Sequence, residues 1–259
     1  MSACSPLYNF VDRGGLSLYH AAMQLLRTVR NMAYRGVSTL FPDQSIESSK
    51  KKWNMLGAEN PRYYVVSKKG TKIAEEEFQE SGEENYDAYI RKDALLTERL
   101  APFKEKRVLD IGSGLGRLTE FFARDFKSAD GVDISDSMVA QATKRLEHVS
   151  NIHFHATDGK SFPFPDGTFD LVFSYIVFQH MPSREIVEEN FKEAYRVLVP
   201  GGTAKIQIRG GHAPFKWQWF YGPSFSEPEG RALAERAGFT VLKTEGAGTK
   251  RFWLWLAKS

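Results

Sequence analysis

Residues 108–116 read Val-Leu-Asp-Ile-Gly-Ser-Gly-Leu-Gly, and this stretch decides the fold of the chain. Its first four residues form a strand-like run that leads into Gly112, Gly114 and Gly116. Residues 117–123 (RLTEFFA) then take up helical spacing. A glycine turn between a strand and a helix brings a nucleotide-like ligand against main-chain N–H groups at the helix start. We therefore predict a ligand site at this turn.

The spacing of the glycines separates two classes of ligand. A dinucleotide site has the pattern Gly-x-Gly-x-x-Gly, which requires a glycine at position 117, where this chain has Arg117. The pattern Asp-x-Gly-x-Gly-x-Gly resembles instead motif I of the class I S-adenosylmethionine-dependent methyltransferases. The resemblance implies S-adenosylmethionine as the cofactor, bound by Asp110, Gly112, Ser113, Gly114 and Gly116.

The composition narrows the class of protein. The chain has 259 residues, 42% hydrophobic and 26% charged, which is typical of a soluble globular protein. A formal net charge of +3 is too small to make nucleic acid an obligatory partner. The single cysteine, Cys4, excludes a disulfide framework and predicts a reducing, cytoplasmic compartment. No apolar run is long enough to span a bilayer. His153 and His155 have no third ligand spaced with them, so we expect no metal site.

Residues 1–85 are expected to form a helical extension that acts as a lid on the following domain. Within it, residues 14–41 have an apolar helical face opposite a polar one, and the only acid before Pro42 is Asp12. Three interpretations of this segment are open: a lid helix, a helix on a membrane surface, and an Arg-rich organellar targeting segment. Residues 42–52 (PDQSIESSKKK) are polar and predict a linker.

Residues 85–100 (NYDAYIRKDALLTERL) predict one continuous helix. In methyltransferases of this class, helices that precede motif I commonly cover the cofactor pocket. The resemblance therefore implies that Tyr86, Tyr89 or Arg91 reaches the methionine end of the ligand. The alternative is that the two tyrosines only pack in the core.

Five alternations of strand and helix follow the glycine motif and predict a doubly wound, Rossmann-like α/β sheet. Ligands of such sheets bind at the carboxyl ends of the strands. Two last strands, 240–245 and 251–257, are expected to close the sheet as a hairpin with an antiparallel final strand, as in the seven-stranded sheet of the family. The resemblance covers residues 86–259, which we take as the S-adenosylmethionine-binding domain.

Acidic residues follow the second and third predicted strands. Asp133 ends the strand 129–134, and an acid there can accept hydrogen bonds from both hydroxyls of a ribose. The alternative role for Asp133 is to cap the next helix, which Ser135 could do without it. Asp158, after the strand 152–156, matches the family's acid that hydrogen-bonds the adenine amino group. The resemblance also assigns three neighbours to the cofactor site: Ile134, Met138 and Gly159.

The fourth predicted strand, 169–174, ends in the sequence Tyr-Ile-Val-Phe-Gln-His. By the resemblance, Ser174 lies where the backbone approaches the cofactor, and Tyr175, Phe178 and His180 lie where the acceptor arrives. Histidine has an ordinary pKa near neutrality. His180 could therefore take a proton from the acceptor, or it could only brace the loop.

An aromatic run at residues 212–225 includes Trp217 and Trp219. These rings either stack on a flat or apolar acceptor or seal the lid.

The expected function is methyl transfer from S-adenosylmethionine to a nitrogen, oxygen or sulfur of a small molecule. A sulfonium already activates the methyl group, so alignment and exclusion of water are the main tasks of the protein. Two alternatives are an RNA or protein methyltransferase, which the even charge disfavours, and a non-catalytic binding module, which the intact motif residues disfavour. The sequence does not decide the oligomeric state.

Overall fold

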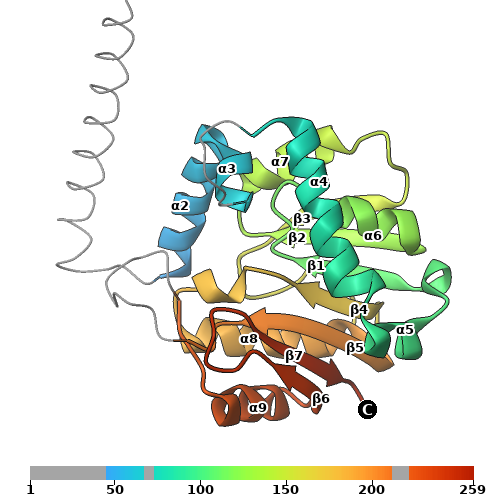
Figure 1. The fold of residues 1–259 in the computed structure, drawn as a ribbon. Helices are drawn as coiled ribbons and strands as arrows, with labels where there is room; N and C mark the ends of the chain where they lie inside the picture. Colours follow the sequence, from blue (N-terminus) through green and yellow to red (C-terminus); the bar gives the residue numbers. More distant parts are fainter. Residues whose placement is uncertain (1–44, 67–72, 212–221) are drawn as a thin grey trace, which may run out of the picture. The chain divides into compact units, whose positions relative to one another are not determined.

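The computed structural model describes residues 45–66, 73–211 and 222–259 (Figure 1). Residues 44–259 form one compact unit. The segment 14–41 and the two tryptophans Trp217 and Trp219 lie outside the described residues. No helix of the described ranges is both long enough and apolar enough to cross a membrane.

A seven-stranded sheet with the order β3-β2-β1-β4-β5-β7-β6 forms the centre of this unit. Its parallel strands at the centre and on one side are β1 (Arg107–Ile111), β2 (Ser128–Asp133), β3 (Ile152–Ala156), β4 (Phe169–Ser174) and β5 (Leu198–Ile208). At the other side, β7 (Phe252–Ala257) is antiparallel to both of its neighbours, β5 and β6 (Thr240–Glu245). The predicted α/β fold with an antiparallel final strand is therefore confirmed.

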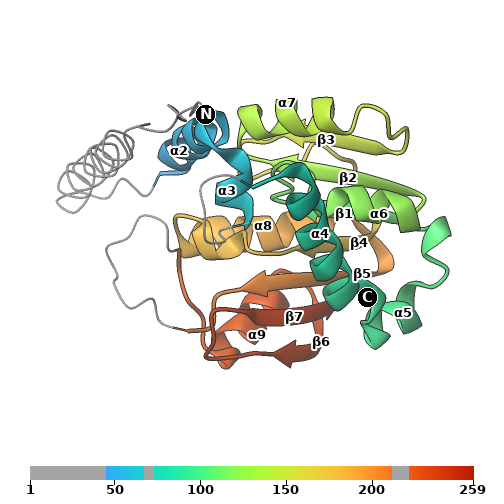
Figure 2. The ribbon, with the colours of Figure 1, turned by 45° about the horizontal axis from the view of Figure 1, so that its top comes forward.

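Helices cover both faces of the sheet, and each face has its own apolar core (Figure 2). One face packs against α4 (Glu75–Tyr86), α5 (Ala94–Leu100), α6 (Thr119–Asp125) and α7 (Asp136–Arg145). The opposite face packs against α8 (Arg184–Val197) and α9 (Glu227–Arg236). Alternate residues of β1 show this division, since Val108 belongs to the first core and Leu109 to the second. The helices cover the two faces and not the carboxyl ends of the parallel strands, which is the edge where ligands of such sheets bind.

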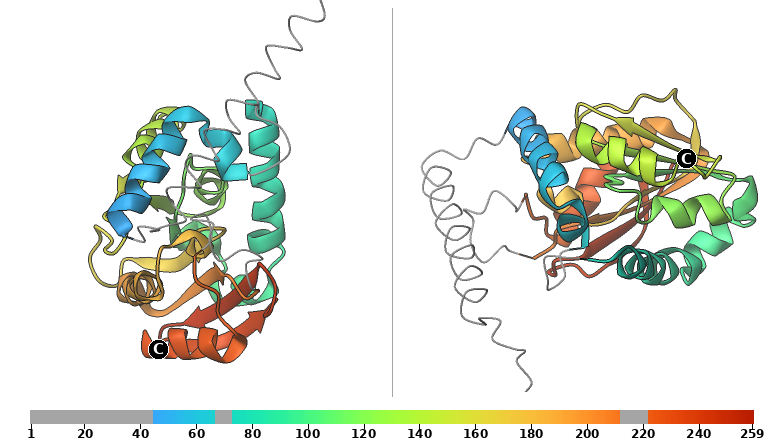
Figure 3. Two further views of the ribbon diagram at one scale, coloured as in Figure 1. Left: turned by 90° about the vertical axis from the view of Figure 1, so that its left-hand side faces the viewer. Right: turned by 90° about the horizontal axis from the view of Figure 1, so that it is seen from above.

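The linker predicted for residues 42–52 is wrong from Ile46 onward, because α2 (Ile46–Glu59) begins there. Ser45 caps this helix and accepts a hydrogen bond from the Ser48 N–H at 3.1 Å. Lys50 Nζ lies 3.0 Å from Asp136 Oδ1 at the start of α7, beside which α2 lies (Figure 3). The polar residues therefore form a helix that tertiary contacts with α7 hold in place, and a short helix α3 (Pro61–Val66) follows.

The single helix predicted for residues 85–100 is also wrong. Helix α4 begins at Glu75, ten positions before the predicted start, and continues as a π-helical turn (Asp87–Arg91). The helix ends there, and α5 begins as a separate helix at Ala94. Asp93 causes the break, because its Oδ1 caps α5 by accepting the Leu96 N–H at 3.1 Å. Its Oδ2 accepts a hydrogen bond from Lys205 Nζ on β5 at 2.6 Å. A cap residue takes extended rather than helical backbone angles, so the helix cannot run through it.

Candidate active site

A cavity opens at the carboxyl ends of β1, β2 and β4, the edge where the sequence predicts the ligand. The space between its lining residues amounts to about 1130 Å³, and this figure includes a part that is open to solvent. Among the predicted site residues, those that line it are Asp110, Gly112, Ser113, Gly114, Asp133, Ile134, Met138, Gly159, Tyr175 and His180. Residues predicted to bind the cofactor and residues predicted to contact the acceptor therefore line the same cavity.

The glycine turn shapes the floor of the cavity. Gly112 has φ of 73° and Gly116 has φ of 75°, both in the left-handed region. A Cβ on Gly112 would lie 2.2 Å from Val177 Cγ2, and a Cβ on Gly116 would lie 2.6 Å from Phe154 Cζ. Gly112 borders the ligand space, whereas Gly116 is not among the lining residues and allows the turn to pack closely on Phe154 and Leu146.

Replacement of Gly112 by alanine is expected to lower the free energy of unfolding through backbone strain and through overlap with Val177. Gly201 provides a matched control, because it has φ of 78° but nothing within 4 Å of a built Cβ. We expect Gly112→Ala to be about 1–2 kcal/mol more destabilising than Gly201→Ala in urea unfolding. Equal losses in the two variants would show that Val177 does not constrain this turn.

Asp110 is buried at the end of β1, with 4% of its surface exposed. Its Oδ2 accepts a hydrogen bond from Thr119 Oγ1 at 2.7 Å. Burial raises the pKa of Asp110 to about 7, and the Thr119 hydrogen bond and the charge of Arg117 oppose that rise. The carboxyl group is therefore partly protonated at neutral pH.

This raised pKa predicts a pH dependence of stability. In the unfolded chain, Asp110 titrates near its ordinary pKa of 3.8, so between pH 4 and 7 the folded state keeps a proton that the unfolded state has lost. The contribution of Asp110 to stability therefore falls as the pH rises through this window. Asp110→Asn has no such titration. We expect its unfolding free energy relative to the parent chain to rise by about 2–3 kcal/mol between pH 5 and pH 8. Urea unfolding at both pH values measures this, and a constant difference would contradict it.

Asp133 lines the cavity beside the glycine turn. Its Oδ2 accepts the Gly114 N–H at 2.9 Å, and its Oδ1 accepts the Ser135 N–H at 2.8 Å. Burial raises the pKa of Asp133 above its ordinary value despite these two bonds. Ser135 is the cap of α7, with its Oγ accepting the Met138 N–H at 3.2 Å. Because two carboxylate oxygens offer about four acceptor positions, Asp133 keeps acceptor capacity for a ligand.

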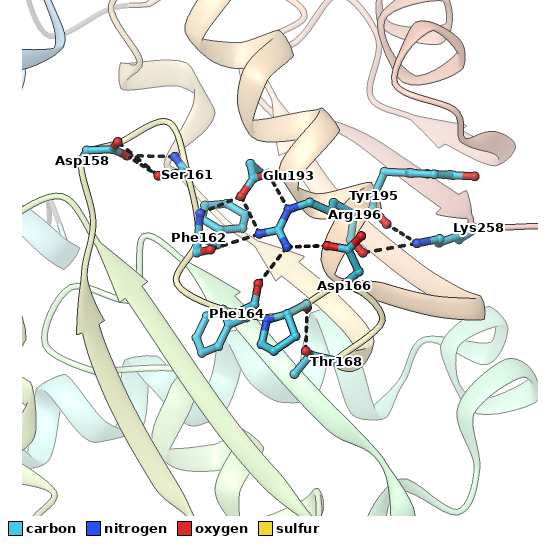
Figure 4. A network of polar contacts seen from close by, with 11 residues as sticks. Asp158, Ser161, Phe162, Phe164, Asp166, Thr168, Glu193, Tyr195, Arg196 and Lys258 are labelled. Carbon is cyan, nitrogen blue, oxygen red and sulfur yellow. Dashed lines mark hydrogen bonds and ion pairs between the residues drawn. The ribbon is translucent and has the colours of Figure 1, made fainter.

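Asp158 is placed differently from Asp133, since it is exposed and does not line the cavity. Its Oδ1 accepts the N–H of Ser161 at 2.8 Å (Figure 4). The same oxygen accepts the N–H of Lys160, also at 2.8 Å. Burial raises the pKa of Asp158, but these backbone hydrogen bonds outweigh it and hold the pKa below its ordinary value. The carboxylate closes a turn, and its neighbours Thr157 and Gly159 line the cavity instead. Contact of Asp158 with an adenine amino group stays a prediction.

The loop after β3 is fixed from α8 by Arg196 (Figure 4). The Arg196 guanidinium donates to the carbonyl oxygens of Phe162 at 3.0 Å and Phe164 at 2.7 Å. Glu193 Oε2 accepts the Phe162 N–H at 2.7 Å. Since Phe162 lines the cavity, these contacts set the position of one wall.

The loop after β4 forms the wall at the predicted acceptor end. Ile176 has φ of 61°, a backbone conformation that is costly for a β-branched residue. Its N–H donates to Oε1 of the buried Gln207 at 2.8 Å, which helps to hold the strained turn. Strain of this kind is typical of functional sites. Ile176 and Val177 both line the cavity, and no sequence signal marks either residue.

His180 lines the cavity together with Trp53 from α2. The two rings meet edge to face with their centroids 5.8 Å apart. The Nε2 atoms of Gln179 and His180 lie 3.0 Å apart. The structure therefore places His180 at the site and also braces its ring, so both roles considered for it are compatible with its position.

Several predicted residues lie outside the cavity lining. Tyr86 packs on Phe121 and Phe122 in the core, and Phe178 packs on Phe191. The remaining members form other contacts: Ser174 Oγ donates to the Ile111 carbonyl at 3.0 Å, Tyr89 contacts Tyr175 and Trp253, and Arg91 pairs with Asp87 and Asp125. Tyr89 is thus one residue removed from the cavity, through Tyr175.

The sequence predicted a lid formed by residues 1–85 but identified no site residue within it. Residues of α2 and α3 line the cavity: Ile46, Ser49, Trp53, Tyr64 and Val65. The return to aromatic residues from Trp53 onward was the available signal for part of this wall. It also missed Arg117, which lines the cavity directly after the glycines. At that position the sequence showed only that a dinucleotide glycine is absent.

Residues 108–202 match the protein family described as "Methyltransferase domain". Phosphoethanolamine N-methyltransferase 2 of Caenorhabditis elegans is 32% identical over 168 residues, which are 61% of this chain and 38% of that protein. The 2-methyl-6-phytyl-1,4-hydroquinone methyltransferase of Synechocystis sp. is 35% identical over 162 residues, 56% of this chain and 49% of that protein. The chain thus spans half or less of the length of these two relatives.

Solved structures share the fold. The magnesium protoporphyrin IX methyltransferase of Synechocystis PCC 6803, determined with bound SAH, superposes with a TM-score of 0.62 at 16% identity. The superposition covers 83% of this chain and all of that one. An S-adenosylmethionine-dependent methyltransferase from Aquifex aeolicus superposes with a TM-score of 0.53 at 20% identity, over 73% of this chain and all of that one. At these identities the likeness concerns the fold.

Proposed function

The chain belongs to the class I S-adenosylmethionine-dependent methyltransferases, and we propose from this that it transfers a methyl group from S-adenosylmethionine to a nitrogen, oxygen or sulfur atom of a small molecule. One observation carries the proposal. A single cavity at the carboxyl edge of the sheet is lined by Asp133, by the turn from Gly112 to Gly114, and by four residues after β4: Tyr175, Ile176, Val177 and His180. A cofactor site and an acceptor site must share one space for direct transfer between them.

The lining residues fit this cofactor. The buried Ser113 Oγ has no hydrogen-bond partner among the described residues, so a polar ligand group would satisfy it. In the proposed arrangement Asp133 binds the ribose hydroxyls, the turn from Gly112 to Gly114 supports the methionine part, and Met138 packs against the adenine. When bound, S-adenosylmethionine supplies a methyl group that its sulfonium already activates.

The chain's own contribution is alignment and exclusion of water. Apolar side chains of Trp53, Ile176 and Val177 line the acceptor end and keep solvent from it. His180 is the proposed base where the acceptor must lose a proton, because it is a titratable side chain in that wall. His180→Gln should then slow methyl transfer while S-adenosylhomocysteine binds as before, and unchanged turnover would leave His180 with the bracing role alone.

We also propose that α2 and α3 belong to a lid formed by residues 1–85. Trp53, Tyr64 and Val65 of these helices line the cavity together with residues at the ends of the strands. Asn54 Oδ1 accepts a hydrogen bond from the Ser137 N–H at 3.1 Å, which ties α2 to the first turn of α7. Contact of residues 14–41 with a membrane stays an open interpretation, and sedimentation of the full chain with anionic phospholipid vesicles tests it.

The test of the function is a transfer of label to fractionated acceptors. The chain is incubated with methyl-labelled S-adenosylmethionine and a cell extract separated into small metabolites, RNA and protein. The proposal predicts label in compounds of the small-metabolite fraction. Label confined to RNA or protein would move the chain to the macromolecular class. Absence of label from every fraction would contradict methyl transfer.

A further inference from the structure

A buried glutamine on β5 contacts the loop that forms the acceptor wall. Gln207 is fully buried and is not among the residues that line the cavity. Its Oε1 accepts the Ile176 N–H at 2.8 Å. Its Nε2 donates to the carbonyl oxygens of Ile208 at 2.6 Å and Lys250 at 3.1 Å. Because a backbone N–H can only donate and a backbone carbonyl can only accept, these groups fix the direction of the Gln207 amide.

The fixed amide of Gln207 orients the side chain of Gln179. Gln207 Nε2 donates to Gln179 Oε1 over a long contact of 3.5 Å. If the Gln179 amide were reversed, two N–H groups would face each other across this contact. In the observed orientation Gln179 Nε2 lies 3.0 Å from His180 Nε2. An amide nitrogen only donates, so Gln179 is the donor and His180 Nε2 is the acceptor.

This chain of hydrogen bonds determines which nitrogen of neutral His180 carries the hydrogen. A neutral imidazole has one N–H and one nitrogen with a lone pair, and the partner of one nitrogen decides the state of the other. Since Nε2 of His180 accepts from Gln179, the hydrogen lies on Nδ1. Nε2 is then the basic nitrogen of the ring.

We propose that Gln207 is a positioning residue for methyl transfer, because through Gln179 it holds neutral His180 in the Nδ1–H tautomer. Nε2 is then the nitrogen that takes a proton from the acceptor. The inference rests on the proposed function, in which His180 is the base. In the proton transfer the N–H, O–H or S–H bond of the acceptor breaks, its electron pair stays on the acceptor atom, and an Nε2–H bond forms. The Gln179 N–H gives way to the acceptor in this step.

Nitrogen-15 NMR of the chain labelled in its histidine rings reads the tautomer directly, at about pH 8, where an ordinary histidine is neutral. The sequence has six histidines, and the His180 signals are those missing from the spectrum of His180→Gln. The parent chain should show a hydrogen on Nδ1 of His180 and none on Nε2. Gln207→Met removes the amide and keeps most of the side-chain volume, so the Nε2–H tautomer should become populated. An Nε2–H tautomer in the parent chain, or an unchanged spectrum in folded Gln207→Met, overturns the proposal.

Two variants of Gln179 test the link to His180, and they decide the question if Gln207→Met does not fold. Gln179 is half-buried and does not line the cavity. Gln179→Met removes the donor, so the Nε2–H tautomer should become populated. Gln179→Glu keeps an acceptor for Gln207 and places a carboxylate at His180, which should put a hydrogen on Nε2. Retention of a bare Nε2 in either variant overturns the proposal.

Steady-state kinetics give the second readout, with the acceptor fraction that label transfer identifies. Gln207→Met should lower kcat about tenfold or more and change KM for S-adenosylmethionine less than about twofold, because it disturbs the base and not the cofactor site. Gln79→Met is the matched control. Gln79 on α4 donates to Glu120 Oε1 at 3.4 Å and does not line the cavity, so kcat and the His180 spectrum should stay unchanged. A loss of kcat in Gln207→Met with an unchanged His180 spectrum would give Gln207 a structural role alone and overturn the proposal.

Failure of the proposed function is distinguishable from failure of this inference. It would appear as no methyl transfer by the parent chain. The NMR spectra of the parent chain and of the Gln207 and Gln179 variants then still decide whether Gln207 sets the tautomer of His180.

Discussion

Replacement of Asp133 by alanine is expected to weaken S-adenosylhomocysteine binding by about 1–3 kcal/mol, which corresponds to roughly 10–100-fold in affinity. Asp133 lines the cavity and accepts two backbone N–H groups, with acceptor capacity left for ribose hydroxyls. The loss has two sources: the hydrogen bonds to the ribose, and the contact that fixes the Gly114 N–H within the turn. Isothermal titration calorimetry measures it directly.

Asp87→Ala is the control for this prediction. Asp87 pairs with Arg91 in the π-helical turn and does not line the cavity. Its removal should leave the affinity unchanged. Asp133→Asn keeps an acceptor atom but loses the charge and should fall between alanine and the parent chain. An unchanged affinity in Asp133→Ala would show that the ribose assignment is wrong.

Replacement of Asp93 by alanine is expected to lower the free energy of unfolding by about 3–5 kcal/mol, because it leaves a buried cation without its counter-charge. Asp93 Oδ2 accepts hydrogen bonds from Lys205 Nζ and from Trp255 Nε1, each at 2.6 Å. Asp93 Oδ1 caps α5, so the variant also loses the helix cap. Urea unfolding followed by circular dichroism gives the free energy.

The double variant Asp93→Ala with Lys205→Met isolates the charge effect. Methionine removes the buried cation and keeps most of the side-chain volume, so the double variant should recover a large part of the loss. The remaining deficit is the cap of α5 and the Trp255 hydrogen bond. A loss below 1 kcal/mol in Asp93→Ala, or no recovery in the double variant, would contradict the assigned role of this pair.

The predictable parts of the fold are those where the local sequence pattern favours the same structure as the tertiary contacts. The strand at residues 169–174 and the helix capped by Ser183 are set by apolar spacing and by the cap residue, both visible in the sequence. The glycine turn is predictable because positive φ at Gly112 and Gly116 is a local requirement that excludes most other residues. From these elements the sheet, its edge and the position of the cavity follow.

The parts that failed depend on contacts distant in sequence. The polarity of residues 46–52 indicates a linker when it is considered without tertiary contacts. In the structure Lys50 pairs with Asp136 in α7, and the segment is helical. The helix expected through Asp93 breaks because this carboxylate caps α5, and its other oxygen pairs with Lys205 on the distant strand β5. No local pattern indicates either partner. Both errors are cases in which a polar residue has a tertiary role that composition does not reveal.

The cavity itself shows the same division. Asp110 and Asp133 end strands, so their place at the ligand edge follows from the topology. Asp158 has the corresponding sequence position, but its carboxylate closes a turn by accepting the N–H groups of Lys160 and Ser161. The direction of this side chain is not visible in the sequence. Arg117 was recognised in the sequence only as a missing glycine, because its burial in the cavity wall is not visible before the fold is known.

The most direct test of the account is calorimetric titration of the full chain with S-adenosylmethionine and S-adenosylhomocysteine, with NAD as the control nucleotide. The glycine spacing and Asp133 predict micromolar binding of the first two compounds and no binding of NAD. Absence of binding of the first two by a folded sample, or binding of NAD in their place, would contradict the assignment of this cavity as an S-adenosylmethionine site.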